Sequence, residues 1–173
     1  MHVAHAGHAS DNLPVSGSLH LVSGKIVAGK STLAKQLASA PQTVLISEDS
    51  WLAQLYPEEL RTVPDYVKLS SRLRTAMEAH IVALLKSGTS VVLDFPSNTP
   101  DTRAWARSIF EKAGAAHYLH FLDVSDEECK KRLRLRNLSG EHPFQVSDEQ
   151  FEQITRHFVV PSAQEGFNLV VHR

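Results

Sequence analysis

The sequence predicts one α/β domain of three layers, in which a mainly parallel sheet of five strands lies between helices. Short apolar runs alternate with longer segments whose apolar residues recur at helical spacing. The length of 173 residues suits a single core, and neither an internal repeat nor an interior linker interrupts the pattern. Strands that alternate with helices in this way favour a parallel sheet with helices on both faces.

The first strand and the first helix flank a glycine-containing loop. Residues 19–22 form a short apolar run that ends at Ser23 and Gly24, which indicates a buried strand. Residues 30–40 carry leucines and alanines at helical spacing, and Pro41 follows them. This pattern predicts a strand, a loop and then a helix.

The middle of the chain predicts two strands on either side of a long helix. Residues 43–46 form the second strand and residues 90–94 the third, which is apolar until its final aspartate. Between them, residues 66–86 carry apolar side chains four positions apart, as in a long amphipathic helix. Gly88 is a suitable stop for that helix.

The remaining elements are marked by helix signals. A helix is expected over residues 101–113, followed by a strand at 118–122. Ser125 precedes three acids that suit a helix N-terminus. Residues 137–143 are rich in turn formers, and Ser147 with Gln150 resembles a capping box that opens a further helix. The fifth strand is expected at residues 167–171.

The first 16 residues are rich in His, Ala, Gly and Ser and have no sustained period. We interpret residues 1–16 as a flexible tail and residues 17–173 as the domain. His2, His5 and His8 could bind a metal if the tail were helical. A solvated tail is favoured, because the segment itself would bear the entropy cost of ordering. The role of the tail stays open.

Composition and charge restrict the partners and the compartment. The net charge is −1, so no overall positive balance drives binding to long duplex nucleic acid. No apolar run is long enough to span a membrane, and the N-terminus lacks the pattern of a secretory signal. The single cysteine excludes an internal disulfide. We therefore expect a cytoplasmic protein with no membrane partner.

The strongest motif is a phosphate-binding loop of the form G-x-x-x-x-G-K-[ST], between a strand and a helix. Its backbone amides and the helix N-terminus favour a bound anion. Lys30 is expected to bridge the β- and γ-phosphates of a nucleotide, and Ser31 to hold Mg²⁺ through its hydroxyl. The expected nucleotide-binding residues are Gly24, Lys25, Ile26, Val27, Ala28, Gly29, Lys30, Ser31 and Thr32.

Two carboxylates follow predicted strands, at the edge of the sheet where ligands of open α/β folds bind. Asp94 ends the third strand, and we assign it to Mg²⁺ together with Ser31. Asp49 follows the second strand, and we assign it as the base that takes a proton from the acceptor hydroxyl, with Glu48 as its nearest competitor. The alternative is that Asp49 or Asp94 merely caps the next helix.

A cluster of cations ends the helix that Ser125 opens. Arg132 and Arg136 are four positions apart and share one helix face, so both could point at a phosphate tail as a small helical lid. For Arg134 we prefer a solvated face. The alternative for the whole cluster is a favourable interaction with the helix C-terminus.

Other polar residues are weaker candidates. Asn98 and Arg103 either line the acceptor side of the site or belong to a turn and a helix cap. His142 and His157 have no metal-ligand spacing, so we expect structural or exposed roles. Cys129 has no base beside it and is expected to take no part in chemistry.

Together these residues resemble the polynucleotide-kinase-like and zeta-toxin-like branch of small P-loop kinases, often catalogued as AAA-family ATP-binding proteins. The resemblance spans residues 19–158 and rests on the phosphate loop, on residues 47–49, on Asp94 with the residues up to Arg103, and on residues 132–137. It implies a P-loop NTPase fold with an arginine-bearing lid, and an Asp49 that activates an acceptor hydroxyl.

One position departs from this family. Phage polynucleotide kinase carries an arginine shortly after its catalytic aspartate, which grips the 3′-phosphate of the substrate, and Leu52 stands at that place here. This departure argues against nucleic-acid ends as the acceptor. The neighbouring Trp51 either stacks on a flat or sugar-like substrate or packs in the core.

The sequence thus predicts a Mg·ATP-dependent kinase that acts on a hydroxyl of a small molecule or nucleotide. Asp49, Lys30, Arg132 and Arg136 are its expected catalytic residues. ATP is the default nucleotide, because no guanine-specifying Asn-Lys-x-Asp motif occurs. The alternatives are a slowly hydrolysing nucleotide switch that acts through a partner protein, and a polynucleotide 5′-hydroxyl kinase. The acceptor and the oligomeric state are left open.

Overall fold

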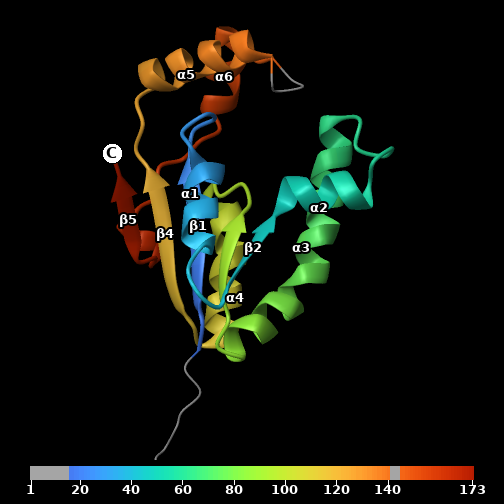
Figure 1. Cartoon of the computed structure of the whole chain (residues 1–173), viewed down its shortest axis with the longest axis vertical. Coiled ribbons are helices and arrows are strands. Elements are labelled where there is room, and N and C mark those ends of the chain that lie inside the picture. Colours follow the sequence, from blue (N-terminus) through green and yellow to red (C-terminus); the bar gives the residue numbers. More distant parts are fainter. Residues whose placement is uncertain (1–15, 141–144) are drawn as a thin grey trace, which may run out of the picture.

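A computed structural model describes residues 16–140 and 145–173, and in it five strands form one sheet (Figure 1). The strand order is β2-β3-β1-β4-β5, and all four pairings are parallel. This confirms the predicted parallel sheet. The strands are β1 (Ser18–Gly24), β2 (Thr43–Ser47), β3 (Ser90–Asp94), β4 (Ala116–Leu122) and β5 (Leu169–His172).

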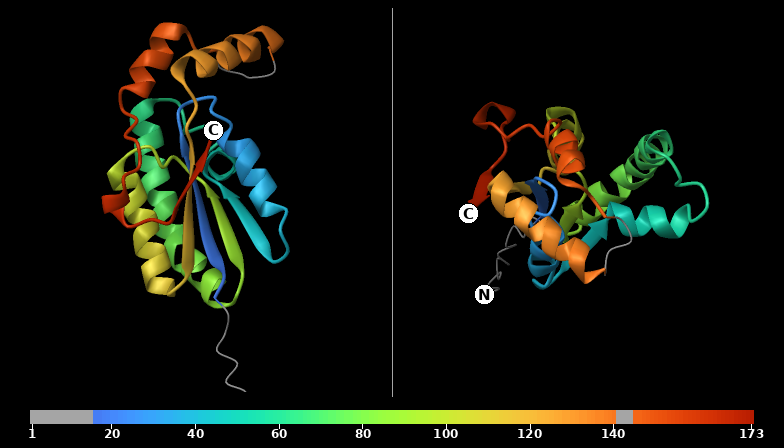
Figure 2. Two further views of the ribbon diagram at one scale, coloured as in Figure 1. Left: turned by 90° about the vertical axis from the view of Figure 1, so that its left-hand side faces the viewer. Right: turned by 90° about the horizontal axis from the view of Figure 1, so that it is seen from above.

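The helices cover both faces of the sheet and its carboxyl edge. Helix α1 lies on one face and helices α3 and α4 on the other, while α5 and α6 lie above the edge where β1 and β4 end (Figures 1 and 2). The three layers and the small helical lid are as predicted. The helices are α1 (Lys30–Ala38), α2 (Glu48–Leu55), α3 (Val63–Lys86), α4 (Pro100–Ala113), α5 (Asp126–Ser139) and α6 (Asp148–Thr155), with a short 3₁₀ turn at Ala163–Glu165.

The core consists of apolar side chains on either side of the sheet. On one side, Leu19 and Leu21 of β1 pack with Ile81 of α3 and Ile109 of α4, all of them buried. On the other side, Val22 of β1 packs against Ala34 of α1. Because successive strand residues point to opposite faces, the run at residues 19–22 supplies both layers at once. The sheet, packed on both faces, holds the loops at its carboxyl edge.

Several boundaries differ from the prediction by a few residues: helix α3 begins at Val63 rather than at residue 66, and β4 begins at Ala116 rather than at residue 118. Helix α5 continues through residues 137–139, where we expected a turn-rich insertion, and it ends at Gly140 with a φ of 65°. The helical continuation is stabilised by Asn137, whose side-chain amide donates to the carbonyl of Val146 at 2.9 Å. The fifth strand begins at Leu169 rather than at residue 167. The predicted caps are confirmed at Ser125 and, as a capping box, at Ser147 with Gln150.

Some predictions fall on residues whose structure is not described. The proposed tail, with His2, His5 and His8, lies outside the described residues except for residue 16, and so does His142. Within the described ranges, no helix combines the length and the apolar character needed to cross a membrane.

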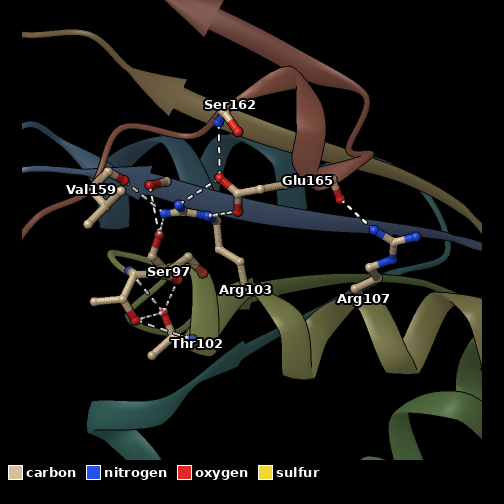
Figure 3. Close-up of polar contacts among 9 residues, drawn as sticks. Ser97, Thr102, Arg103, Arg107, Val159, Ser162 and Glu165 are labelled. Atoms are coloured by element: carbon tan, nitrogen blue, oxygen red, sulfur yellow. Dashed lines mark hydrogen bonds and ion pairs between the residues drawn. The ribbon is translucent and has the colours of Figure 1, made fainter.

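Arg103 of α4 is fully buried and ties three segments together (Figure 3). Its Nε and Nη2 donate to the carboxylate of Glu165 at 2.6 and 2.9 Å. Its Nη1 donates at 3.0 Å to the carbonyl of Ser97 and to that of Val159. Arg103 therefore fixes the loop after β3 and the chain that returns from the lid, and the expectation that it lines the acceptor side is wrong.

Replacing Glu165 with glutamine is expected to lower the free energy of unfolding by about 2 kcal/mol, because the guanidinium of Arg103 loses its charged partner while it stays buried. Urea denaturation measures this loss. Glu111→Gln is the control: the Arg107–Glu111 pair is about half exposed, so the cost should stay below about 0.5 kcal/mol. Equal losses in the free energy of unfolding for the two variants would show that the ion pair of Arg103 with Glu165 does not stabilise the fold.

Three histidines form a hydrogen-bonded row across β1, β4 and β5. The ring nitrogens of His20 and His120 lie 3.0 Å apart, as do those of His120 and His172. Ser18 Oγ lies 2.9 Å from the other ring nitrogen of His20. Burial lowers the pKa of His120 to about 4, and burial also lowers the pKa of His20. His120 is therefore neutral at pH 7.

The folded protein is expected to lose stability as the pH falls from about 6.5 to about 4. The unfolded chain binds a proton at position 120 within this window and the folded chain does not, so each pH unit removes up to about 1.4 kcal/mol. Urea midpoints between pH 7.5 and pH 4.5 measure the slope. His120→Phe should reduce the slope. An unaltered slope in His120→Phe would disprove the assignment.

Candidate active site

The phosphate-binding loop curls between the end of β1 and the start of α1. Gly29, immediately before α1, has a φ of 102°, in the left-handed region that favours glycine. At Gly24 a β-carbon would lie 3.2 Å from both Ala28 and Leu122, so the close approach of the loop to β4 favours a residue without a side chain. Both glycines of the motif thus have a local structural cause.

The Lys30 side chain folds back over the loop. Its Nζ donates to the carbonyl of Gly24 at 2.9 Å and to that of Lys25 at 2.7 Å. Burial lowers the pKa of Lys30, while the nearby carboxylates of Asp94 and Asp49 oppose this shift. The ammonium group therefore sits at the centre of the loop, where a phosphate would gain most from it.

Lys25 connects the loop to the lid. Its Nζ lies 2.5 Å from the carboxylate of Asp126 at the start of α5, and it donates to the carbonyl of Val124 at 3.2 Å. The side chain is thus turned away from the loop interior. Only the backbone amide of Lys25 remains suited to the predicted phosphate contact.

The cations of α5 divide between two faces of the helix. Arg132 donates to the carbonyl of Ala28 at 3.3 Å, and with Arg136 it faces the loop. Arg134 instead pairs with Asp148 of α6, which agrees with its predicted place away from the site. A cavity of about 420 Å³ separates lid and loop, and it is lined by Val27, Gly29, Lys30, Ser31, Thr32, Arg132 and Arg136.

A second cavity, of about 500 Å³, also adjoins the loop. Lys30 and Ser31 line both cavities. The second one therefore brings the two predicted carboxylates to the same wall as the predicted phosphate-binding residues. Its lining consists of Ile26, Lys30, Ser31, Asp49, Tyr66, Asp94, Phe95, Pro96, Asn98 and Ile154.

The alternative that the two aspartates cap helices is wrong. Ser47 is the N-cap of α2, so Asp49 lies within the first helical turn. The N-cap of α4 is Thr99, and Asp94 is the last residue of β3. Parallel pairing of Ser47 with Asp94 places the ends of β2 and β3 side by side. This register is what brings Asp49 and Asp94 to one cavity.

Glu48, the competitor for the role of base, is fully buried. The hydroxyl of Tyr66 donates to its Oε1 at 2.5 Å, and Nε of Arg74 donates to its Oε2 at 3.0 Å. Burial and this hydrogen bond raise the pKa of Tyr66. Glu48 therefore joins α2 to α3 and is not among the residues that line the cavity.

The side chains at this wall fit a magnesium ion. Ser31 and Asp94 offer a hydroxyl and a carboxylate oxygen, and Asp49 lines the same cavity. Magnesium prefers such oxygen ligands, and in phosphate-transfer sites it needs only one or two carboxylates besides phosphate and water. In the described part of the chain, no group of three His, Cys, Asp or Glu residues offers a richer metal site.

Several candidates lie elsewhere. Trp51 is 42% exposed, so the expectation that it packs in the core is wrong, and it does not line either cavity. His157 is exposed, which agrees with one of the two roles predicted for it, structural or exposed. Cys129 is buried against Leu133 and Phe151, and burial raises the pKa of its thiol.

The sequence interpretation missed part of the second cavity. Phe95 and Pro96 directly follow β3, so their position at the carboxyl edge of the sheet could have identified them as lining residues. Tyr66 and Ile154 come from α3 and α6, and no spacing in the sequence relates them to Asp49.

The fold recurs in known proteins. A family model described as an AAA domain matches residues 19–161. No curated protein matches the chain. A protein of Chloroflexus aurantiacus, provisionally named a kinase, superposes with a TM-score of 0.71 at 16% identity, over 91% of this chain and 85% of that one.

Two further solved structures are similar in fold. A gluconokinase from Sinorhizobium meliloti has a TM-score of 0.54 at 18% identity, over 90% of this chain and 82% of its own. Kti12 of Chaetomium thermophilum, solved with ADP-AlF3, has a TM-score of 0.60 at 17% identity, over 89% and 88% of the two chains. These likenesses confirm the predicted P-loop kinase-like fold.

Proposed function

The chain belongs to the AAA domain family, and on this premise we propose that it is an ATP-dependent phosphotransferase. It moves the γ-phosphoryl group of ATP to a hydroxyl of a small molecule or nucleotide. The observation that carries the proposal is that the two cavities share Lys30 and Ser31. A triphosphate in the first cavity would thus present its end to Asp49 and Asp94 in the second.

Binding falls to the loop and the lid. The amides of residues 24–32 and the Lys30 ammonium hold the phosphates, and Arg132 and Arg136 approach them from α5. Ser31 and Asp94 are the residues that would hold Mg²⁺, which neutralises phosphate charge when bound. Because little covalent chemistry is left to the protein, positioning and charge supply most of the rate.

Asp49 has the role of base. It accepts the proton of the acceptor hydroxyl while that oxygen bonds to the γ-phosphorus and the bond from the γ-phosphorus to the bridging oxygen breaks, so that ADP leaves. The burial of Glu48 against Tyr66 and Arg74 supports the choice of Asp49. The similar gluconokinase and the ADP-AlF3 complex of Kti12 are consistent with phosphoryl transfer and nucleotide binding in this fold.

Two details complete the proposal. The single cysteine is buried, which suits a reducing, cytoplasmic compartment. Leu52, at the place of the arginine that grips a 3′-phosphate in phage polynucleotide kinase, is fully buried in the core. Its burial disfavours a polynucleotide acceptor, because this position offers no cation to the site.

ATP turnover with and without a panel of metabolites and oligonucleotides tests the proposal. We expect strong stimulation by one small acceptor, with a phosphorylated product. Slow hydrolysis that no acceptor changes would instead support the nucleotide switch, and stimulation by 5′-hydroxyl oligonucleotides alone would support the polynucleotide kinase.

A further inference from the structure

A third cavity, of about 470 Å³, continues the site between α3 and α4. It shares Tyr66 and Pro96 with the cavity that contains Asp49 and Asp94, so the two spaces have a common wall. Its other lining residues are Val67, Ser70, Ser71, Arg74, Thr75, Glu78, Thr102 and Trp105. The volume of each of these two cavities is within the usual range for ligand sites, so an acceptor can extend from the cavity that contains Asp49 and Asp94 into the third cavity.

Aromatic rings form one side of this third cavity, which we call the outer cavity. Trp105 is half-buried and stacks on Phe95, with ring centroids 5.5 Å apart. The guanidinium carbon of Arg74 lies 5.5 Å from the Trp105 ring and 5.9 Å from the Phe95 ring. The hydroxyl of Tyr66 donates a hydrogen bond to Glu48, and Tyr66 lines the wall that the two cavities share. Such a surface favours a planar or apolar group.

The ionised side chains of the outer cavity already have partners. Arg74 is bound to Glu48 at 3.0 Å, and Glu78 is bound to Lys112. The remaining polar side chains of the lining carry Ser and Thr hydroxyls, the Tyr66 hydroxyl and the indole nitrogen of Trp105. Among the described residues that line this space, the only cation is Arg74, and its charge is already offset by the carboxylate of Glu48. The lining therefore disfavours an anionic group. Nearer the loop, such a group would also meet both Asp49 and Asp94.

We propose that the acceptor is an uncharged hydroxyl compound with a ring or apolar body, such as a nucleoside or an aryl glycoside. Its reacting hydroxyl lies at Asp49, and its ring lies in the outer cavity against Tyr66 and Trp105. The hydroxyl proton passes to Asp49 as the new oxygen–phosphorus bond forms and ADP leaves. This inference rests on the proposed kinase function and adds the class of acceptor.

Matched acceptors test the class directly. Transfer of labelled phosphate from ATP is measured for uridine against uridine 3′-monophosphate, and for phenyl β-glucoside against glucose and gluconate. We expect kcat/KM to be at least about tenfold higher for one uncharged, ring-bearing compound than for its charged or ringless counterparts, a difference of about 1.4 kcal/mol. A preference of that size for the charged or ringless member of each set would overturn the inference.

A variant that fills the outer cavity gives an independent test. Ser71→Trp is expected to raise KM for the preferred acceptor at least about tenfold, and to leave the Kd for Mg·ATP within about twofold. Arg72→Trp is the control, because Arg72 is the next residue of α3, is exposed and lines none of the three cavities. An unchanged KM in Ser71→Trp would also overturn the inference.

These outcomes separate the inference from the function on which it rests. Preference for gluconate, or indifference to Ser71→Trp, leaves the kinase proposal standing and removes only the acceptor class. If no acceptor is phosphorylated although Mg·ATP binds, the kinase proposal fails, and the inference fails with it.

Discussion

Replacing Lys30 with alanine is expected to weaken the binding of Mg·ATP at least about 100-fold, or by about 2.8 kcal/mol. The ammonium group lies over the loop and lines both cavities, so it would contact the phosphates from the centre of the site. A buried, charge-assisted contact of this kind is among the strongest that a side chain can offer. Calorimetric titration of the variant measures the loss.

Lys25→Ala is the matched control for Lys30→Ala. Both lysines belong to the loop, but the Lys25 side chain is directed to Asp126 and Val124 at the start of the lid. We expect its removal to change the Kd for Mg·ATP by less than about threefold, because the backbone amide is kept. Equal losses in the two variants, with both proteins folded by circular dichroism, would contradict the role given to Lys30.

Replacing Asp49 with asparagine is expected to lower kcat for phosphoryl transfer by about 10² to 10⁴, the usual contribution of a general base. Asparagine keeps the size of the side chain and removes its ability to take the proton. The Kd for Mg·ATP should stay within about twofold, because the nucleotide phosphates are held by the loop. Transfer at a near wild-type rate would show that another group is the base.

Glu48→Gln separates chemistry from folding at the neighbouring position. Glu48 is buried between Tyr66 and Arg74, so the neutral variant leaves the Arg74 guanidinium without its charged partner. We expect a loss of stability of about 2 to 3 kcal/mol and little change in kcat of the folded protein. A loss of kcat as large as that of Asp49→Asn, in a protein of unchanged stability, would reverse the assignments of the two acids.

The layers and the approximate positions of most elements were predictable, because they depend on local patterns. The strand at residues 90–94 was predicted to the residue, and the helix from Ser125 was fixed by a cap that the structure retains. The end of that helix was not predictable. Residues 137–139 are turn formers, but they stay helical, and the side chain of Asn137 donates a hydrogen bond to the carbonyl of Val146, nine residues further on. Tertiary contacts of this kind override local preference.

The site was predictable where it lies at the ends of parallel strands. The strand pattern placed Asp49 and Asp94 at the carboxyl edge of the sheet. The pairing of β2 with β3, which the pattern did not specify, brings the two to one cavity. The partners of Glu48 and Arg103 were not predictable. Arg74 is 26 residues from Glu48, and Glu165 is 62 residues from Arg103, so no periodicity relates them. The sequence therefore left open whether Arg103 lines the site, although it belongs to the core.

The central claim is that residues 24–32 hold a nucleotide polyphosphate. Isothermal titration of the folded protein with ATP and with GTP, each in the presence of Mg²⁺, tests it most directly. We expect saturable binding of Mg·ATP with one nucleotide per chain. The absence of binding heat for both nucleotides, from protein whose fold is verified in the same sample, would contradict the claim and remove the basis for the proposed activity.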